Sequence, residues 1–254
     1  MSRIEKSHDP AKKLAYANEL YGKKKYMQAN QLYSELLTVY KGTKEFEDMY
    51  YNYAYSSLKL EDYEQAAYHF KNFVDIFPNS PRAEEMDYMQ AYCYYKLSPR
   101  VELDQKSTTQ AISAMQTFID THPGSARIAE ATRIIDLCRK KLEEKEFKAA
   151  ELYYDIGLFH AAAVSFKNLM RDYPDSQSSD QYKYMAIKSY YEYAENSIIE
   201  KQSERYEQVV TEYLDFADRY PQSTYLKDAE QFYTQTQDHL KSLQNEQVKE
   251  KPKQ

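Results

Sequence analysis

The sequence is poor in several residue types, and each shortage excludes a class of protein. It contains no tryptophan, two cysteines and only four glycines. It has neither the glycine-rich loop that binds phosphates in nucleotide-dependent enzymes nor the serine elbow of a hydrolase. No apolar run approaches the ~18 residues of a membrane span. No basic stripe is long enough to follow a nucleic-acid backbone, so we expect no nucleic-acid partner.

Residue types that could carry catalysis occur only in isolation. Cys93 and Cys138 each fall inside a predicted helix without a second ligand nearby, which favours buried free thiols over a disulfide or a reactive site. The acidic pairs Glu84–Glu85 and Glu143–Glu144 are typical of a solvated helix surface. We therefore predict no enzymatic activity, no cofactor and no metal site. The histidines are scattered singly along the chain: His8, His69, His122, His160 and His239.

Tyrosine and helix-forming residues dominate what is present. The 254 residues include 28 tyrosines, and the formal net charge is −6. Alanine, glutamate, lysine and glutamine are abundant and no clear strand pattern occurs, which predicts an all-α chain. A tyrosine side chain has a large apolar body and a polar tip, so it suits surfaces that lie half in a core and half in water.

The stretch from Tyr63 to Pro78 defines a unit that recurs along the chain. The closing proline ends a helix, because the residue before a proline is pushed out of the α region. Before it, four residues at steps of three and four share one helix face: Tyr63, Ala66, Phe70 and Phe73. Four further segments have the same spacing, the first of them with a lysine in place of the proline: Tyr26–Lys41, Thr108–Pro123, Phe159–Pro174 and Tyr206–Pro221.

This spacing resembles the second helix of the tetratricopeptide (TPR) repeat, which has an aromatic, a small residue, an aromatic, an apolar residue and a closing proline. The intervals between the prolines exceed the roughly 34 residues of a plain TPR, so the helices must be longer or the loops must carry insertions. We predict an all-α, right-handed TPR-like superhelix of five helix pairs plus a C-terminal capping helix. An ordinary helical bundle is the alternative.

One solenoid domain accounts for most of the predicted chain. The span 125–156 has no proline or glycine that would interrupt it before its end, which favours one long helix over two. The last predicted helix carries glutamine and lysine outward, as the polar end of a solenoid requires. We expect disorder at residues 1–9 and 244–254, and a solenoid over 10–243 with repeats at about 10–42, 44–80, 81–124, 125–176 and 177–223 and the cap at 224–243.

The first helices of the N-terminal repeats carry the candidate binding site. In a TPR stack these helices line a groove that accepts extended peptides. Counting from the small residue at each helix contact (Ala17, Ala54 and Ala91) gives positions that face this groove, unless half of them bury into the next repeat. Tyrosines dominate these positions, which predicts docking of a peptide with aromatic or apolar side chains. The predicted peptide-binding residues are Leu14, Asn18, Tyr21, Tyr51, Tyr55, Leu58, Tyr88, Tyr92 and Tyr95.

An insertion in the third repeat connects the chain to a known family. The segment SPRVELDQ separates the two helices of this repeat, and AISAMQTFIDTHPGS follows it. These segments resemble the BamD family, most closely its Bacteroidota-type lipoproteins. Further matching segments are FVDIFPNSPRAEE, DYMQAYCYY and AAELYYDIG. The resemblance covers about residues 10–243. The insertion motif consists of Ser98, Pro99, Arg100, Asp104 and Gln105.

The resemblance implies a non-enzymatic subunit of the outer-membrane β-barrel assembly machinery, held at the periplasmic face of the outer membrane by an acylated N-terminal cysteine. It implies that the N-terminal repeats bind signals of unfolded outer-membrane β-barrel proteins. It implies that the C-terminal repeats, on surface residues between Tyr153 and Tyr191, contact the periplasmic domains of the central subunit, BamA. The chain starts at Met1-Ser2 without an apolar leader or a lipid-bearing cysteine, so we expect the lipid anchor to lie outside this sequence.

Two other functions are compatible with a tyrosine-lined TPR groove. One is a different periplasmic TPR scaffold, which coordinates cell-envelope or peptidoglycan processes; such proteins carry an N-terminal coiled coil, for which residues 1–12 are too short. The other is a cytosolic chaperone cofactor, whose groove presents a basic clamp rather than tyrosines. An upstream apolar segment ending at a cysteine favours the assembly subunit over both.

Overall fold

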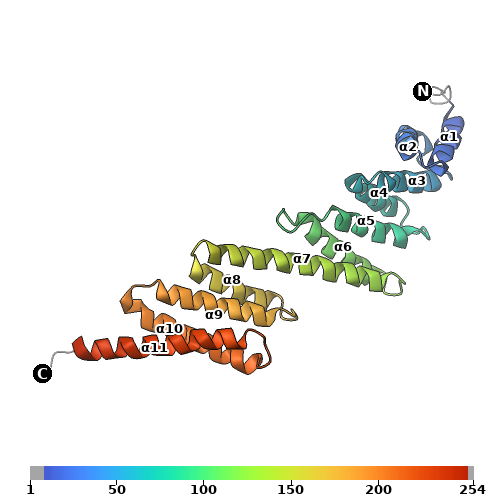
Figure 1. Ribbon diagram of the computed structural model, residues 1–254. Helices are drawn as coiled ribbons and strands as arrows, with labels where there is room; N and C mark the ends of the chain where they lie inside the picture. Colours follow the sequence, from blue (N-terminus) through green and yellow to red (C-terminus); the bar gives the residue numbers. More distant parts are fainter. Residues whose placement is uncertain (1–8, 251–254) are drawn as a thin grey trace. The chain divides into compact units, whose positions relative to one another are not determined.

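The structure is a computed structural model, and it describes residues 9–250. Within these residues the chain forms eleven helices and no strand, which confirms the predicted all-α fold (Figure 1). None of these helices is both long and apolar enough to cross a bilayer. Most of the predicted disordered N-terminus, residues 1–8, lies outside the described residues. The helices are α1 (Pro10–Gly22), α2 (Tyr26–Tyr40), α3 (Phe46–Lys59), α4 (Tyr63–Ile76), α5 (Ala83–Leu97), α6 (Lys106–Thr121), α7 (Ile128–Asp155), α8 (Phe159–Asp172), α9 (Ser179–Glu195), α10 (Ile199–Arg219) and α11 (Leu226–Glu250).

The repeat spacing sets both the ends and the buried faces of the second helices. Helices α4, α6, α8 and α10 each end two residues before the proline that closes their repeat, as expected from the backbone restriction before proline. At the start of α4, the Asp62 side chain accepts a hydrogen bond from the backbone N–H of Gln65 at 3.2 Å, as an N-cap does. The second position of the spacing is fully buried in every copy: Ala29, Ala66, Ala111, Ala162 and Val209.

The chain divides into two compact units, whereas the sequence predicts a single solenoid domain. The boundary falls between Leu142 and Glu143, inside α7. In unit 1, one buried cluster surrounds Phe70 and a second surrounds Met115. In unit 2, the buried clusters surround Phe166 and Phe216. The separate clusters have a physical reason, because a repeat buries its apolar face only against its neighbours and no core extends along the whole chain.

The sequence predicts the length of helix α7 correctly but not that of helix α11. Helix α7 is continuous over 28 residues, as the lack of proline and glycine predicts. It ends at Asp155, two residues before Gly157, whose φ of +79° suits glycine, and the N–H of Leu158 donates to the carbonyl of Tyr153 at 2.9 Å. Helix α11 continues to Glu250, so the predicted disordered tail is wrong for residues 244–250. Its glutamine, glutamate and lysine residues are good helix formers, and no proline interrupts them.

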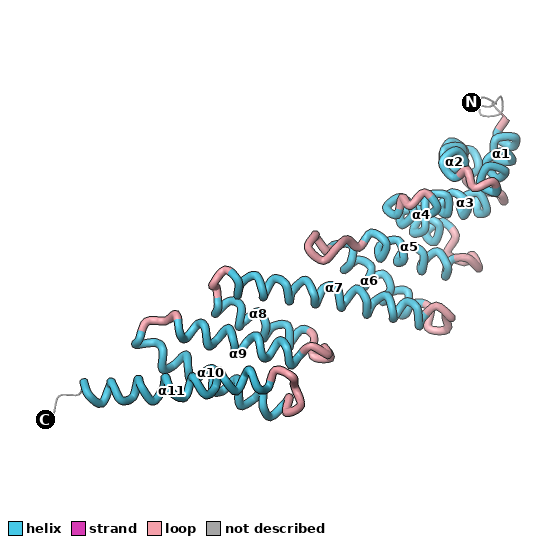
Figure 2. Tube along the Cα trace, in the orientation of Figure 1, coloured by secondary structure: helices cyan, strands magenta, loops and turns pink. Residues whose placement is uncertain are grey.

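A serine two residues after each closing proline joins one repeat to the next across the short inter-repeat turns (Figure 2). Its hydroxyl donates to a carboxylate of the preceding first helix. Its oxygen also accepts a hydrogen bond from the backbone N–H two residues on, which orders the turn. The motif Pro-x-Ser therefore marks each junction that follows a closing proline. The four pairs are Ser80–Glu47, Ser125–Glu84, Ser176–Glu143 and Ser223–Asp180.

Candidate functional site

The predicted peptide-binding residues lie on the first helices of unit 1, and most of them are half-buried. The exceptions are Tyr88, which is 5% exposed, and Asn18, which is exposed while its Oδ1 accepts a hydrogen bond from the Tyr33 hydroxyl at 2.8 Å. Tyr21 packs edge-on against Tyr26 of α2. Residues of α1 therefore mainly contact their own repeat. The more continuous surface, which we call the tyrosine face, consists of Tyr51 and Tyr55 on α3 and Tyr88, Tyr92 and Tyr95 on α5.

Ring contacts order each half of the tyrosine face, and one carboxylate connects the two halves. The rings of Tyr51 and Tyr55 lie 4.7 Å apart, and those of Tyr88 and Tyr92 stack at 6.3 Å. The Tyr55 hydroxyl donates to Oε1 of Glu85 at 2.7 Å, and the Tyr51 hydroxyl lies 3.4 Å from Oε2. Burial raises the pKa of Tyr55, and the bonded Glu85 carboxylate raises it further. The Tyr55 hydroxyl therefore stays protonated and donates its hydrogen bond to Glu85, within the protein.

Two arginines cover rings of the tyrosine face. The Arg82 guanidinium lies 4.6 Å from the ring centroid of Tyr51, and the Arg127 guanidinium lies 4.8 Å from that of Tyr88. Such cation–π contacts stabilise by about 0.5–1 kcal/mol at exposed sites. Each arginine follows its junction serine by two residues, so the arrangement repeats in successive repeats. In unit 2, Tyr225 occupies the corresponding position and stacks on Tyr184 at 4.9 Å.

The sequence interpretation missed this charged component. Glu84 and Glu85 read as a solvated acidic pair, yet Glu84 accepts the Ser125 hydroxyl and Glu85 accepts the Tyr55 hydroxyl. Glu143 likewise accepts hydroxyls from Ser176 and Tyr182 rather than lying free on a helix surface. The motif Pro-x-Ser-x-Arg occurs before both α5 and α7 and could have drawn attention to the two arginines.

The insertion motif of the third repeat forms an ordered loop around Gln105. Its Nε2 donates to the carbonyls of Arg100 at 2.8 Å and Leu103 at 3.0 Å, and its Oε1 accepts the Thr108 hydroxyl at 2.6 Å. Gln105 is 6% exposed, so the loop has a polar centre of its own. The Asp104 side chain accepts from the backbone N–H of Lys106, the first residue of α6, at 3.0 Å.

Lys141 of α7 fixes the beginning of the same loop. Its Nζ donates to the Ser98 hydroxyl at 2.6 Å and to the Pro99 carbonyl at 3.0 Å. The Ser98 hydroxyl in turn contacts the hydroxyl of Thr108 at 2.6 Å, which bonds to Gln105. Among the insertion residues, Ser98 and Gln105 therefore hold the loop in place. Arg100 and Asp104 are the insertion residues that are exposed.

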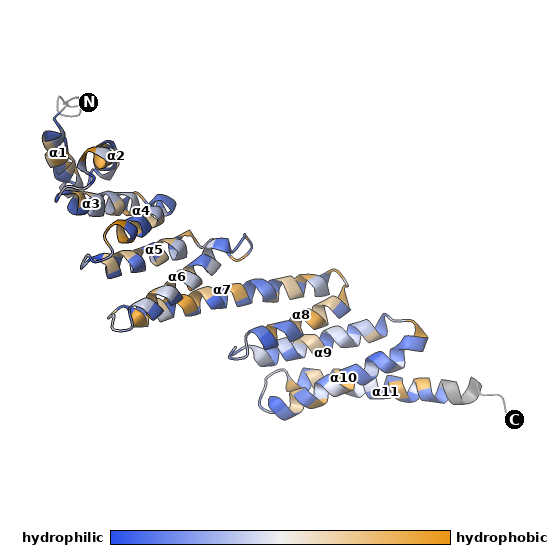
Figure 3. Ribbon diagram, turned by 180° about the vertical axis from the view of Figure 1, so that it is seen from behind, coloured by the Kyte–Doolittle hydropathy of each residue, from blue (hydrophilic) through white to orange (hydrophobic). Residues whose placement is uncertain are grey.

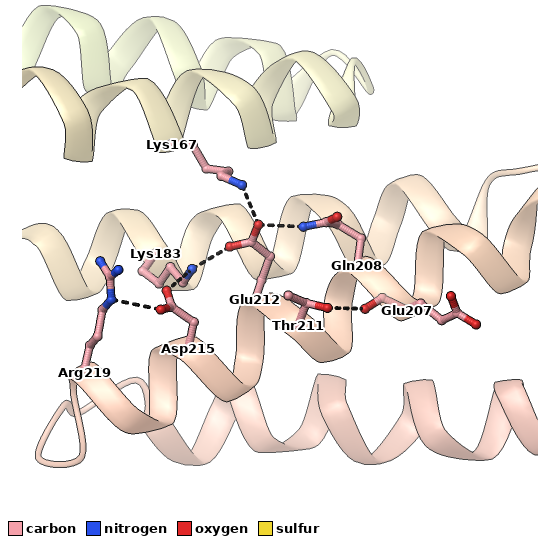
Figure 4. A network of polar contacts seen from close by, with 8 residues as sticks. All are labelled: Lys167, Lys183, Glu207, Gln208, Thr211, Glu212, Asp215 and Arg219. Carbon is pink, nitrogen blue, oxygen red and sulfur yellow. Dashed lines mark hydrogen bonds and ion pairs between the residues drawn. The ribbon is translucent and has the colours of Figure 1, made fainter.

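Unit 2 contains a network of charged groups between α8, α9 and α10 (Figure 4). Lys183, 5% exposed, contacts Oε2 of Glu212 and Oδ2 of Asp215, each at 2.5 Å. Lys167 donates to Oε1 of Glu212 at 2.6 Å, and Arg219 pairs with Asp215 at 2.9 Å. Burial alone would raise the pKa of Glu212, but the hydrogen bonds from the two lysines outweigh it and lower that pKa. These residues line a hollow of about 460 Å³.

Exposed apolar side chains collect at one end of unit 2. Figure 3 shows hydrophobic residues at the turn between α7 and α8 and at the turn between α9 and α10. Half or more of the surface of Ile156 and Leu158 is exposed, at 58% and 51%, and Ile198 at the other turn is 67% exposed. Tyr153, at the end of the predicted partner-binding stretch, is also exposed. We call Tyr153, Ile156, Leu158, Ile198 and Ile199 the apolar edge.

The helix pairs, the repeat spacing and the serine junctions define a TPR-like repeat protein. The family model described as "YfiO: Outer membrane lipoprotein" matches residues 8–204, and the chain belongs to this family. The sequence resemblance to BamD-family lipoproteins is thereby confirmed.

Named relatives agree with this membership. The outer membrane protein assembly factor BamD of Caulobacter vibrioides is 24% identical over 136 residues, covering 54% of this chain and 45% of that protein. The factor of the same name from Rickettsia prowazekii is 24% identical over 171 residues, covering 67% and 68%. The chain thus spans less than half the length of the first relative. A solved TPR repeats protein from Bacteroides fragilis aligns with a TM-score of 0.41 and 16% identity, covering 92% of this chain and 100% of that one.

Proposed function

We propose that this protein is a non-enzymatic adaptor of outer-membrane β-barrel assembly, lipid-anchored at the periplasmic face of the outer membrane. The family description and the two relatives named as assembly factors support this assignment. The observation that carries the proposal is the tyrosine face of unit 1, a set of rings on neighbouring first helices that are half-buried except for Tyr88. Its ligand is the signal segment of an unfolded outer-membrane protein, bound in an extended conformation.

The tyrosine face suits such a segment through ring contacts rather than through its hydroxyls. A strand destined for a barrel alternates apolar and polar residues, so one side of it can lie on the rings. The Tyr55 hydroxyl is already bonded to Glu85, which leaves ring surface as its contribution. An aromatic contact contributes roughly 0.5–1.5 kcal/mol beyond the area it buries, so a segment on a few rings binds weakly and reversibly. A transient adaptor requires such binding.

Unit 2 carries the proposed contact with the periplasmic domains of BamA. The apolar edge falls in the stretch between Tyr153 and Tyr191 and continues at the next turn, at Ile198. Large exposed apolar groups at two neighbouring turns are costly in water and are typical of a surface that a partner covers. The proposal therefore assigns the signal segment to unit 1 and the central subunit to unit 2.

Replacing Tyr55 and Tyr92 together by alanine tests the substrate half of the proposal. The double variant should lose about 1–3 kcal/mol of binding to a labelled peptide from the C-terminal strand of a barrel protein, because two ring contacts disappear. Fluorescence anisotropy measures the affinity, and circular dichroism checks that helicity is retained. The pair Tyr55→Phe and Tyr92→Phe keeps the rings and should bind like the parent. Tyr68→Ala, an exposed tyrosine of α4, is the surface control. Unchanged binding by the alanine variant would contradict the proposal.

A further inference from the structure

We propose that Arg127 binds the free C-terminal carboxylate of an extended segment lying on the tyrosine face. This inference rests on the proposed function, because it names the chemistry by which the end of the bound segment is recognised. It also assigns a role to a residue that precedes α7 and lies outside the set predicted from the sequence. It is supported by the position of Arg127 over the ring of Tyr88, by its spare hydrogen-bond donors and by the contrast with Arg82.

Arg127 is held in place by the tyrosine face itself. Its guanidinium lies over the ring of Tyr88, 4.8 Å from the centroid, and its side chain is 42% exposed. A guanidinium held over a ring face by a cation–π contact still has N–H donors that can bind a carboxylate. The ordered turn supports this position, because the backbone N–H of Arg127 donates to the Ser125 hydroxyl at 3.1 Å. The cation thus lies over the ring of Tyr88, which in turn stacks with the ring of Tyr92.

The donors of Arg127 are largely unused by acidic groups of the described chain. A guanidinium has five N–H donors. Within the described residues, one carboxylate lies within 4.0 Å of it, that of Glu85, and the Nη2–Oε1 distance of 3.7 Å is too long for a hydrogen bond. Glu85 instead accepts the Tyr55 hydroxyl at 2.7 Å. A carboxylate from outside can form two parallel bonds with such a guanidinium, the strongest geometry available to this pair.

Arg82 occupies the corresponding position one repeat earlier but is already paired. Its Nη1 donates to Oδ1 of Asp48 at 2.6 Å while the guanidinium covers Tyr51. An incoming carboxylate would have to compete with Asp48 at this position. Arg127 therefore has donors for the carboxylate at the end of the segment, whereas Arg82 contributes packing along it. The difference supplies a matched control within the same surface.

A peptide with alternating apolar and polar residues and a C-terminal phenylalanine, prepared as the free acid and as the C-terminal amide, tests the inference on the full chain. We expect the parent to bind the acid about tenfold more tightly than the amide, as loss of a charge-assisted pair predicts. Arg127→Gln should bind both forms equally, at the level of the amide. Arg82→Gln should retain the preference for the acid. Circular dichroism checks that each variant is folded.

The outcomes separate this inference from the proposed function. If the parent binds acid and amide with equal affinity, the role of Arg127 is wrong and substrate binding by the tyrosine face still holds. If Arg127→Gln keeps the preference for the acid, the carboxylate site lies elsewhere and the inference is wrong. If neither form binds the parent, the proposed function of unit 1 fails and the inference fails with it.

Discussion

Replacing Lys183 with methionine should destabilise unit 2 by about 3 kcal/mol. The substitution leaves Glu212, 3% exposed, without one of its two lysine partners, and removes one partner of Asp215. Breaking a buried ion pair costs about 3–5 kcal/mol, because an uncompensated charge stays in the interior. We expect the lower end of that range, since Lys167 still donates to Glu212. Urea denaturation gives the loss of stability, and amide hydrogen exchange shows whether it is confined to α9 and α10.

Two further variants separate loss of pairing from loss of packing. Lys183→Met combined with Glu212→Leu removes both buried charges and should regain most of the stability, as apolar replacements of buried pairs do. Arg219→Gln removes a partner of Asp215 that is 63% exposed, and should cost less than about 1 kcal/mol. A single Lys183→Met variant as stable as Arg219→Gln would show that the network of Figure 4 contributes little to unit 2.

Unit 1 should lose stability as the pH falls, because of His69. Burial lowers the pKa of this histidine from its ordinary 6.5 to about 4, and Asp62 partly opposes the effect. The ring is packed among Tyr50, Tyr53 and Tyr68, and its buried Nδ1 has no hydrogen-bond partner within the described structure. Between these two pKa values the unfolded chain binds a proton that the folded chain does not. Stability contributed by neutral His69 is therefore complete above about pH 6.5 and falls by about 3 kcal/mol toward pH 4.

The His69→Phe variant isolates this effect from the titration of carboxylates. It keeps an aromatic ring at the site and removes the group that titrates, so its stability should fall less between about pH 7 and pH 4.5 than that of the parent. Urea unfolding at both pH values measures the difference. Identical pH dependence in the parent and in His69→Phe would contradict the assignment.

The fold was predictable because its signals are local. Ala66 and Phe70 share a helix face through their spacing, and Pro78 stops the helix through its own backbone geometry. The tyrosines of α3 and α5 follow from the same counting, since a residue's position on a helix fixes the face it occupies. The split inside α7 was not predictable in this way. The first half of α7 packs into the cluster around Met115 and the second half into the cluster around Phe166, and these partners are distant in the sequence.

The charged groups were missed because their partners are distant in the sequence. Arg127 and Tyr88 belong to different repeats, and their contact depends on the turn that Ser125 orders. Lys183 reads as a surface lysine, since lysine is rarely fully buried. One local signal was available for it. Lys183 precedes Ala186 and Ile187, both fully buried, by three and four residues, which places it on the buried face of α9.

The most direct test of the account measures two ligands against two surface variants. One ligand is the C-terminal barrel peptide, followed by fluorescence anisotropy, and the other is the periplasmic region of BamA, followed by calorimetry. The account predicts that Tyr55→Ala with Tyr92→Ala loses affinity for the peptide and keeps affinity for the BamA domains. It predicts the reverse for Ile156→Ser with Leu158→Ser, which removes exposed apolar groups of the apolar edge. Loss of BamA binding in the tyrosine variant, with peptide binding intact, would contradict the assignment of peptide binding to unit 1 and BamA binding to unit 2.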